Sequence, residues 1–160
     1  PGMTFESVHH LRKTVAGRVL RRPAWWFDPR VAGVGLADVG THLVDLSLWA
    51  AFPDVPIDHR RDVAVLDASV WATPLDRDQY EAITGRPDFP GDLPPGLLTG
   101  DRLLYPGNGA VTYTVRGVHV RVRVEWGVEA DAGDGDRHAV VVRGTKGALS
   151  VRPVGGRSEV

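Results

Sequence analysis

The clearest pattern in the chain is the alternation of residues 118–126, VHVRVRVEW, between apolar and polar side chains. Four valines and Trp126 occupy every second position, and histidine, arginine and glutamate stand between them. A period of two is that of a β-strand, whose successive side chains point to opposite faces. The stretch therefore predicts a strand with one face in the core. A slip of one residue would bury two arginines, so the register is strongly specified.

Further strands are predicted along the second half of the chain. Residues 61–71 alternate imperfectly, and shorter alternating or apolar stretches follow at 103–105, 111–115, 138–142 and 148–152. The last two are joined by a glycine-containing turn, which indicates a hairpin. Pro106-Gly107-Asn108-Gly109 is also expected to form a turn, because proline and glycine interrupt regular structure.

One short helix and two loops are predicted between these strands. Residues 75–84 have helical spacing, with Asp76 able to cap the start and Gly85 able to end it. Residues 86–97 contain four prolines and are expected to form a loop or lid. Residues 131–136, DAGDGD, lack the later ligands of a helix–loop–helix calcium site, which favours a hairpin loop.

The first half of the chain begins with a stretch of helical spacing. Apolar residues recur every three or four positions over residues 5–16, FESVHHLRKTVA, which predicts a helix. On such a helix the adjacent His9 and His10 would point about 100° apart. That divergence favours a structural or surface role for the two histidines over a shared metal ion.

A second and more unusual helix is predicted within the stretch of residues 33–49, GVGLADVGTHLVDLSLW. At about 100° per residue, one row falls within a sector of about 60° and consists of Asp38, His42, Asp45 and Trp49. Another row is apolar and consists of Leu36, Val39, Leu43, Leu46 and Ala50. Because the stretch has no Lys or Glu, we expect a mostly buried helix whose polar row faces a cleft. The alternative is a buried Asp–His pair that only satisfies itself.

The order of these elements predicts the fold class. Helices early and antiparallel strands late indicate an α+β fold, a mainly antiparallel open sheet with helices packed on one face. A length of 160 residues suits one domain, which we assign to residues 1–152, followed by a poorly ordered tail over 153–160. The chain opens with Pro1-Gly2-Met3, so we expect an upstream part of the protein to be missing.

Composition narrows the classes of partner. The net charge of −1 gives no reason to expect nucleic acid or a membrane surface as a partner. The absence of cysteine excludes disulfides and thiolate metal sites. No apolar run approaches the roughly 20 residues of a membrane span. These features are compatible with a cytoplasmic protein.

Several short motifs in order resemble a known family. They are Trp25-Trp26-Phe27-Asp28-Pro29, Gly35-Leu36-Ala37-Asp38-Val39, Thr41-His42-Leu43-Val44-Asp45 and Gly144-Thr145-Lys146-Gly147. From about residue 7 to 152 the chain is similar to the second domain of the glucose–fructose oxidoreductase / inositol dehydrogenase (Gfo/Idh/MocA) family. The closer match is the branch described as a "putative oxidoreductase C-terminal domain". The resemblance implies an open sheet whose free face often forms a subunit interface, so a homo-oligomer is expected.

The resemblance also implies a cofactor and a second domain. In the family an N-terminal Rossmann domain binds NAD or NADP through a Gly-x-Gly-x-x-Gly loop and carries a catalytic lysine. Here Gly33-Val34-Gly35 precedes a helix but the third glycine of that loop is missing, and neither Lys13 nor Lys146 lies in the family's lysine motif. Cofactor-binding residues are therefore expected in the missing N-terminal domain, and the isolated chain is expected to be inactive.

The resemblance places the Asp-x-x-x-His pair beside the nicotinamide and a sugar-like substrate, which suits the chemistry of these side chains. Hydride transfer from an alcohol carbon requires removal of the hydroxyl proton, and a neutral imidazole accepts a proton near neutral pH. We assign that role to His42 and the orienting role to Asp38. The candidate substrate-binding residues are Asp45, Trp26, Asp28 and His138.

Other readings stay open. The chain could be a non-catalytic ligand-binding or oligomerisation module that keeps the fold without redox work; close relatives carry a glutamate where Val34 stands. The tryptophans at 25 and 26 could pack in a core or form a stacking wall for a sugar. Asp38 and His42, four residues apart, could ligate a divalent ion, but no metal is assigned.

Overall fold

A computed structural model describes residues 1–131, 135–154 and 157–159. The elements, in chain order, are β1 (Gly2–Arg12), β2 (Thr14–Val15), β3 (Arg18–Val19), η1 (Ala24–Phe27), α1 (Pro29–Ala32), α2 (Val39–Ala51), α3 (His59–Asp62), β4 (Val63–Leu75), α4 (Arg77–Thr84), β5 (Leu98–Thr99), β6 (Arg102–Val115), β7 (Val118–Glu129), β8 (Arg137–Arg143), β9 (Ala148–Val154) and β10 (Arg157–Glu159).

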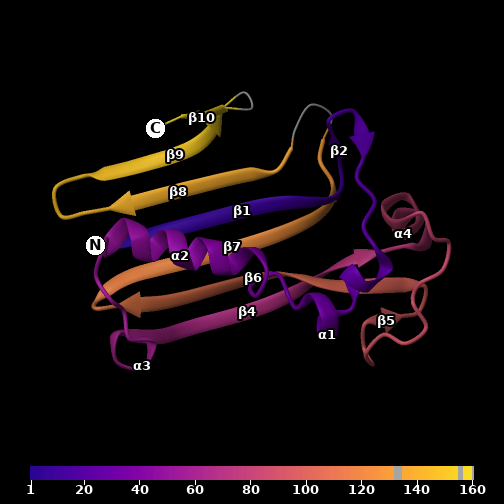
Figure 1. The fold of residues 1–160 in the computed structure, drawn as a ribbon, viewed down its shortest axis with the longest axis horizontal. Helices are drawn as coiled ribbons and strands as arrows, with labels where there is room; N and C mark the ends of the chain where they lie inside the picture. Colours follow the sequence, from indigo (N-terminus) through magenta and orange to yellow (C-terminus); the bar gives the residue numbers. More distant parts are fainter. Residues whose placement is uncertain (132–134, 155–156, 160) are drawn as a thin grey trace.

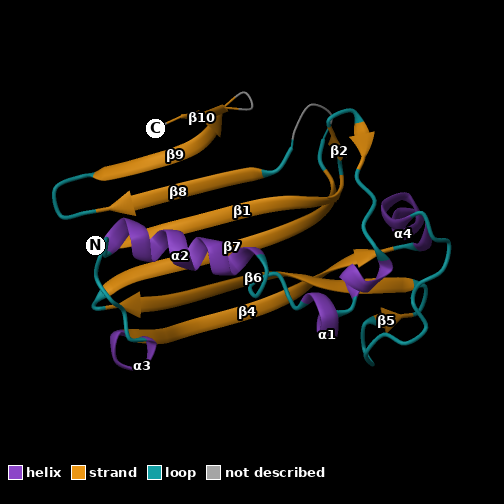
Figure 2. Cartoon of the chain, viewed as in Figure 1, coloured by secondary structure: helices purple, strands orange, loops and turns teal. Residues whose placement is uncertain are grey.

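One large sheet organises the chain (Figure 1). Its strands run in the order β10-β9-β8-β1-β7-β6-β4, and β5 pairs with β6 at one end. Every neighbouring pair is antiparallel except β1 and β7, which are parallel. Helix α2 lies across β7 and β1 on one face of the sheet (Figure 2). The α+β prediction, a mainly antiparallel open sheet covered by helices, is confirmed. No helix in the described ranges is long and apolar enough to cross a membrane.

Strand β7 has the predicted register. Val120, Val122, Val124 and Trp126 are buried on the face under α2, whereas Arg121 on the opposite face is exposed. Strict alternation determined this outcome because the alternative register would place guanidinium groups in the core. The strands predicted at 61–71, 111–115, 138–142 and 148–152 are likewise present in β4, β6, β8 and β9.

The helix predicted over residues 5–16 is wrong, because residues 2–12 form β1 in the middle of the sheet. Met3, Phe5 and Ser7 are buried and pair in register with Val120, Val122 and Val124. Phe5 and Ser7 therefore continue a period of two that the helical template overlooked. The helical spacing was coincidental, and pairing on both edges of the strand outweighs local preference.

The turn predicted at residues 106–109 is also wrong, because β6 continues through it. A Cβ on Gly35 would lie 1.6 Å from the backbone oxygen of Gly107, and one on Gly109 would lie 2.7 Å from the Leu36 side chain. These glycines let the segment before α2 touch the sheet directly, a close approach that only a residue without a Cβ allows. The register between β4 and β6 shifts at the same place, between Trp71 and Thr73.

Helix α2 presents a different face to the sheet from the one predicted. Leu43 and Ser47 are buried, and the Ser47 hydroxyl lies 2.7 Å from the Tyr113 hydroxyl on β6. Leu46, expected in the apolar row, is 49% exposed, and Ala50 is exposed as well. The helix is thus half-covered, not mostly buried, because one sheet face can bury only one side of a helix.

Helix α4 follows the prediction for residues 75–84 closely. Asp76 accepts a hydrogen bond from the backbone of Gln79, and the Gln79 side chain accepts one from the Asp76 backbone, which completes a capping box. Gly85 ends the helix in the left-handed conformation at φ 77°. Apart from the short β5, residues 86–101 contain no helix or strand, as expected for a loop.

The end of the chain continues the sheet. Strand β9 extends to Val154, and β10 pairs with it in antiparallel register. The tail predicted at 153–160 therefore contains strand residues, while residues 155–156 and 160 lie outside the described part. The loop predicted at 131–136 also includes undescribed residues, 132–134.

Candidate functional site

The polar residues predicted on the central helix begin at its first turn. Asp38 is the N-cap of α2, but its carboxylate makes none of the hydrogen bonds by which an N-cap side chain holds the first turn. Asp38 is half-buried, whereas His42, Asp45 and Trp49 are exposed. We call these four residues the helix row. His42 does not point into an apolar core, so the self-satisfied buried pair is not what the chain forms.

Asp38 lies beside an aromatic group that the fold assembles from distant segments. The Trp26 indole Nε1 donates to the Tyr105 hydroxyl at 3.1 Å, and the Arg22 guanidinium carbon lies 4.6 Å from the centre of the Trp26 ring. Burial raises the pKa of Tyr105 to about 12, and the nearby Asp38 carboxylate acts in the same direction. Tyr105 is therefore a neutral hydrogen-bonding group at physiological pH.

A second polar group lies on the sheet itself, on the same face as Val122 and Val124. The Ser7 hydroxyl is hydrogen-bonded to His9 Nε2 and lies 3.0 Å from His138 Nδ1. His9 Nδ1 lies 3.1 Å from a carboxylate oxygen of Asp136. Trp126 stacks on His9 with ring centres 4.8 Å apart. We call these five residues, Ser7, His9, Trp126, Asp136 and His138, the sheet cluster.

Burial and hydrogen bonds together set the charge states of His9 and Asp136 in the sheet cluster. Burial lowers the pKa of His9 below its ordinary value despite the opposing effect of Asp136. Burial by itself would raise the pKa of Asp136, but hydrogen bonds from Lys13, at 2.5 Å, and His9 lower it. The cluster near neutral pH thus consists of a neutral His9 beside an ionised Asp136.

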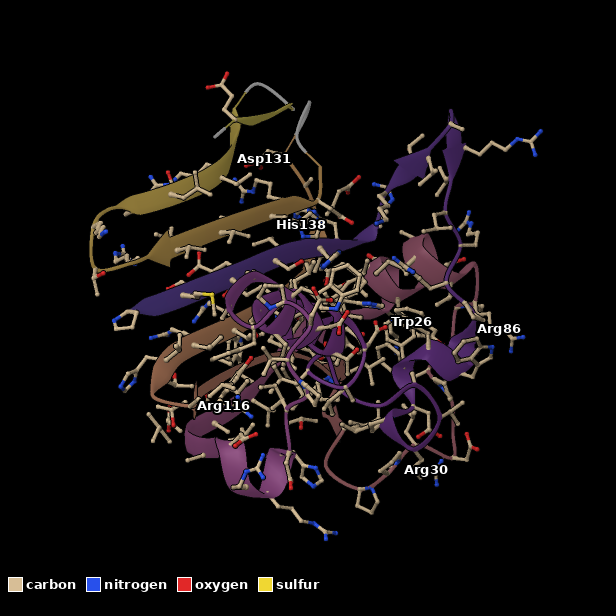
Figure 3. All side chains as sticks on the ribbon, turned by 60° about the vertical axis from the view of Figure 1, so that its left-hand side comes forward. Trp26, Arg30, Arg86, Arg116, Asp131 and His138 are labelled. Atoms are coloured by element: carbon tan, nitrogen blue, oxygen red, sulfur yellow. The ribbon has the colours of Figure 1, made fainter. Side chains whose placement is uncertain are left out.

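Trp126 connects the sheet cluster to the aromatic group near Asp38. Its ring centre lies 5.9 Å from that of Trp26 and 5.3 Å from the Arg22 guanidinium. Trp26 and His138, both labelled in Figure 3, mark the two ends of this connected region. The backbone of Trp126 is held in turn by Asn108, whose side-chain oxygen accepts its N–H at 2.6 Å. One continuous network of polar and aromatic side chains, most of them shielded from water, therefore runs from His138 on β8 to Tyr105 on β6.

The structure brings some of the predicted substrate-binding residues into this network and leaves others apart. Trp26 and His138 belong to it. Asp45 lies on the exposed side of α2. Asp28 instead caps α1 and accepts hydrogen bonds from the Arg30 backbone and guanidinium, which lower its pKa. Arg30 donates hydrogen bonds to both carboxylate oxygens of Asp28. Asp28 therefore has a local structural role.

Sequence reasoning missed Ser7, His9, Arg22, Tyr105 and Asp136. Ser7 and His9 could have been found by reading residues 5–9 as a strand, because a strand places both side chains on one face. Arg22, Tyr105 and Asp136 carry no local signal, because only the fold brings them together. Within the described ranges, no three His, Cys, Asp or Glu side chains are arranged to hold a metal ion.

The chain is similar to known proteins in sequence and in fold. The family described as "Putative oxidoreductase C terminal domain" matches residues 1–157. A crystal structure of a protein named as a putative oxidoreductase from Parabacteroides merdae is similar with a TM-score of 0.90 and 39% identity. The match covers 95% of this chain and 34% of that protein, so this chain spans about a third of that protein's length. No curated protein matches.

Proposed function

The chain belongs to the oxidoreductase C-terminal domain family, and from that membership we propose that it is the substrate-binding part of an NAD(P)-dependent oxidoreductase. Its substrate is a sugar, polyol or related hydroxy compound. The domain works with an N-terminal dinucleotide-binding domain of the same protein. When bound, the nicotinamide would accept or donate a hydride. This chain supplies the groups that bind the substrate and transfer the proton of its hydroxyl group.

The observation that carries the proposal is the state of Asp38. An aspartate at a helix N-cap ordinarily bonds the backbone of the first turn, and this one does not. Its carboxylate is thus left for another partner, one helical turn before the exposed imidazole of His42. In the proposed reaction His42 takes the hydroxyl proton and Asp38 orients the imidazole or the hydroxyl. Trp26, Tyr105 and His138 offer the aromatic face and hydrogen-bonding groups of a sugar site.

The residues before α2 do not fit a dinucleotide. Gly33 and Gly35 could suggest a phosphate loop, but Gly35 packs against Gly107 with no room for even a Cβ. This contact with β6 explains why residue 35 is a glycine. The backbone there is packed against the sheet and does not form a phosphate-binding loop. The proposal therefore assigns the cofactor to the other domain and routes no step through it here.

A second candidate function is a non-catalytic module that keeps the fold for ligand binding or assembly. Val34, at a position where the family resemblance implies a glutamate, favours this candidate. In either case we propose that copies of the chain associate through the sheet face opposite α2. That face presents His119 and Arg121 to solvent, and Arg123 stacks on Trp71 at 4.7 Å from the ring centre.

The deciding experiment is the His42→Ala substitution in the protein that joins this domain to its cofactor-binding domain. We expect turnover to fall by about 10²–10⁴-fold, because general base catalysis contributes that much. Cofactor affinity should stay the same, since the other domain holds the dinucleotide. His59→Ala, an exposed histidine on α3, is the matched control.

Each result separates the two candidates. Unchanged turnover in the His42→Ala variant would remove the catalytic role and leave the fold assignment standing. An inactive parent protein with intact ligand binding would favour the non-catalytic module. Calorimetry of the 160-residue chain with NAD(P) should show no binding, and tight binding would overturn the division of labour between the domains.

A further inference from the structure

Arg22 differs from the arginines of the chain that pair with acidic side chains. Arg12, Arg30, Arg77 and Arg116 each form an ion pair with a carboxylate. Arg22 is half-buried, and within the described ranges its side chain forms no such pair. Its Nε is shielded from solvent and has no hydrogen-bond partner. An enclosed N–H without an acceptor is costly, so the placement of the Arg22 side chain calls for an explanation.

Aromatic packing fixes the Arg22 guanidinium without using its hydrogen bonds. The group lies 4.6 Å from the ring centre of Trp26 and 5.3 Å from that of Trp126. Such contacts attract the cation to the ring faces but accept none of its N–H groups in the guanidinium plane. The Nε is enclosed, whereas the terminal Nη1 and Nη2 are not among the shielded atoms without partners. The planar group is therefore held in one orientation with its outer edge available.

The surroundings of Arg22 are open to a small anion. Arg22 lines a hollow of about 520 Å³ together with Arg21, Trp25, Thr84 and Arg86, and no acidic residue lines it. Three arginines around one hollow produce a positive potential that attracts anions. Arg21 itself donates to two backbone oxygens at the end of α4, so its guanidinium is already engaged. Among these lining residues, Arg22 and the exposed Arg86 are the arginines whose guanidinium groups make no hydrogen bond within the described part of the chain.

Arg22 also belongs to the candidate site. It contacts Trp26, whose indole donates to Tyr105, and Asp38 and Asp136 both lie close enough to act on its charge. Neither carboxylate reaches ion-pair distance within the described part of the chain. An acceptor for the outer edge of the guanidinium is therefore supplied from outside the described chain, beside Trp26 of the candidate site.

We propose that Arg22 binds a carboxylate on the substrate, so that the hydroxy compound handled at this site is a sugar acid or a related hydroxy acid. The inference rests on the proposed function and specifies its substrate class. Two N–H groups on the outer guanidinium edge match the two oxygens of a carboxylate. Asp38 and Asp136 add negative charge nearby, which disfavours a dianionic phosphate more than a singly charged carboxylate.

The test is calorimetric titration of the protein that joins this domain to its cofactor-binding domain, with D-glucuronate and D-glucose, which differ only in the carboxylate at C6. We expect glucuronate to bind at least about tenfold more tightly, as charge-assisted paired hydrogen bonds require. Arg22→Gln should abolish the preference, and Arg22→Lys, which retains the charge, should keep only part of it. Arg121→Gln, on the opposite sheet face, is the control and should leave the preference intact.

Other outcomes would overturn the proposal. They are equal binding of the two sugars, no binding of glucuronate, a preference that survives Arg22→Gln in a folded variant, and tighter Arg22-dependent binding of glucose 6-phosphate. Circular dichroism confirms folding of each variant. Because binding is measured here and turnover in the His42→Ala experiment, failure of the carboxylate proposal does not imply failure of the redox proposal.

Discussion

The helix row and the sheet cluster are two polar regions on the same side of the sheet, and they differ in how their groups are satisfied. His42, Asp45 and Trp49 of the helix row are exposed, and the Asp38 carboxylate leaves its capping role unfilled. In the sheet cluster, Ser7 and His9 are mostly shielded from water and bonded to each other and to neighbouring strands. Water satisfies the first region, and the protein satisfies the second except at the Trp126 indole Nε1, which is buried without a hydrogen-bond partner among the described residues.

This difference indicates which of the two regions contributes to the stability of the fold. Buried polar groups must keep their partners, because an orphaned donor or acceptor costs more than its bond contributes. Exposed groups can be replaced at little cost to the fold. The sheet cluster is therefore expected to affect both stability and binding, whereas the helix row is expected to affect function alone.

The largest contrast is expected between two tryptophans. Trp126 is 4% exposed in the sheet cluster and Trp49 is 72% exposed in the helix row. Trp126→Ala leaves a cavity and should lower the free energy of unfolding by about 3–5 kcal/mol. Trp49→Ala should change it by less than about 0.5 kcal/mol. Urea denaturation of both variants measures the difference, and equal losses would show that the helix row is also part of the packed structure.

A smaller difference in the free energy of unfolding is expected between variants at Asn108 and Asp45. Asn108 is 3% exposed; its side chain accepts from the Trp126 backbone and donates to Thr73 Oγ1 at 2.8 Å. Asn108→Ala leaves these buried groups unpaired and should cost about 1–3 kcal/mol. Asp45→Ala, on the exposed side of α2, is the matched control and should cost less than about 0.5 kcal/mol. If thermal unfolding shows no loss for Asn108→Ala, the contact between β6 and β7 does not hold Trp126.

The smallest effect is a pH dependence centred on His9. Burial lowers its pKa in the folded chain, so near pH 6 the unfolded chain binds more protons than the folded one. Stability contributed by neutral His9 is present above the ordinary pKa of about 6.5 and is lost as the pH falls through the lowered value. Asp136 acts in a separate window, below its ordinary pKa.

Urea titrations between pH 5 and 8 measure this dependence. His9→Gln should flatten the slope of stability against pH below pH 6.5, with the difference from the parent chain constant at pH 7.5–8. Nuclear magnetic resonance should place the His9 titration below 6.5 directly. A titration above the ordinary value would mean that Asp136 outweighs burial, and the His9–Asp136 pair would then be an ion pair at neutral pH.

Parts of the fold were predictable because their signals are local. The alternation of β7 admits one register, and the hairpin of β8 and β9 is marked by its glycine turn. Helix α4 has both its cap and its stop within ten residues of each other. The helix row was also predictable, since a helix converts a spacing of three or four residues into a shared face.

Other parts were not predictable because partners distant in sequence decide them. Residues 5–16 have a helical spacing, yet residues 2–12 lie between β7 and β8 and take their conformation from those strands. Pro106 to Gly109 read as a turn because glycine has two uses, reversal of the chain and close approach of another backbone. Only contact with Gly35 shows that the second use applies here.

By itself the sequence determined the α+β class, the family, the faces of β7 and the spacing that puts Asp38 and His42 on adjacent turns. These depend on periodicity and on short motifs, which need no knowledge of distant contacts. Tertiary structure alone decided which side of α2 is covered and that Arg30 donates to both oxygens of Asp28. It also decided that Arg22 packs on Trp26 and Trp126 with its Nε lacking an acceptor among the described residues. Burial and pairing are properties of three-dimensional neighbours, and in this chain the decisive neighbours lie on strands and loops far apart in the sequence.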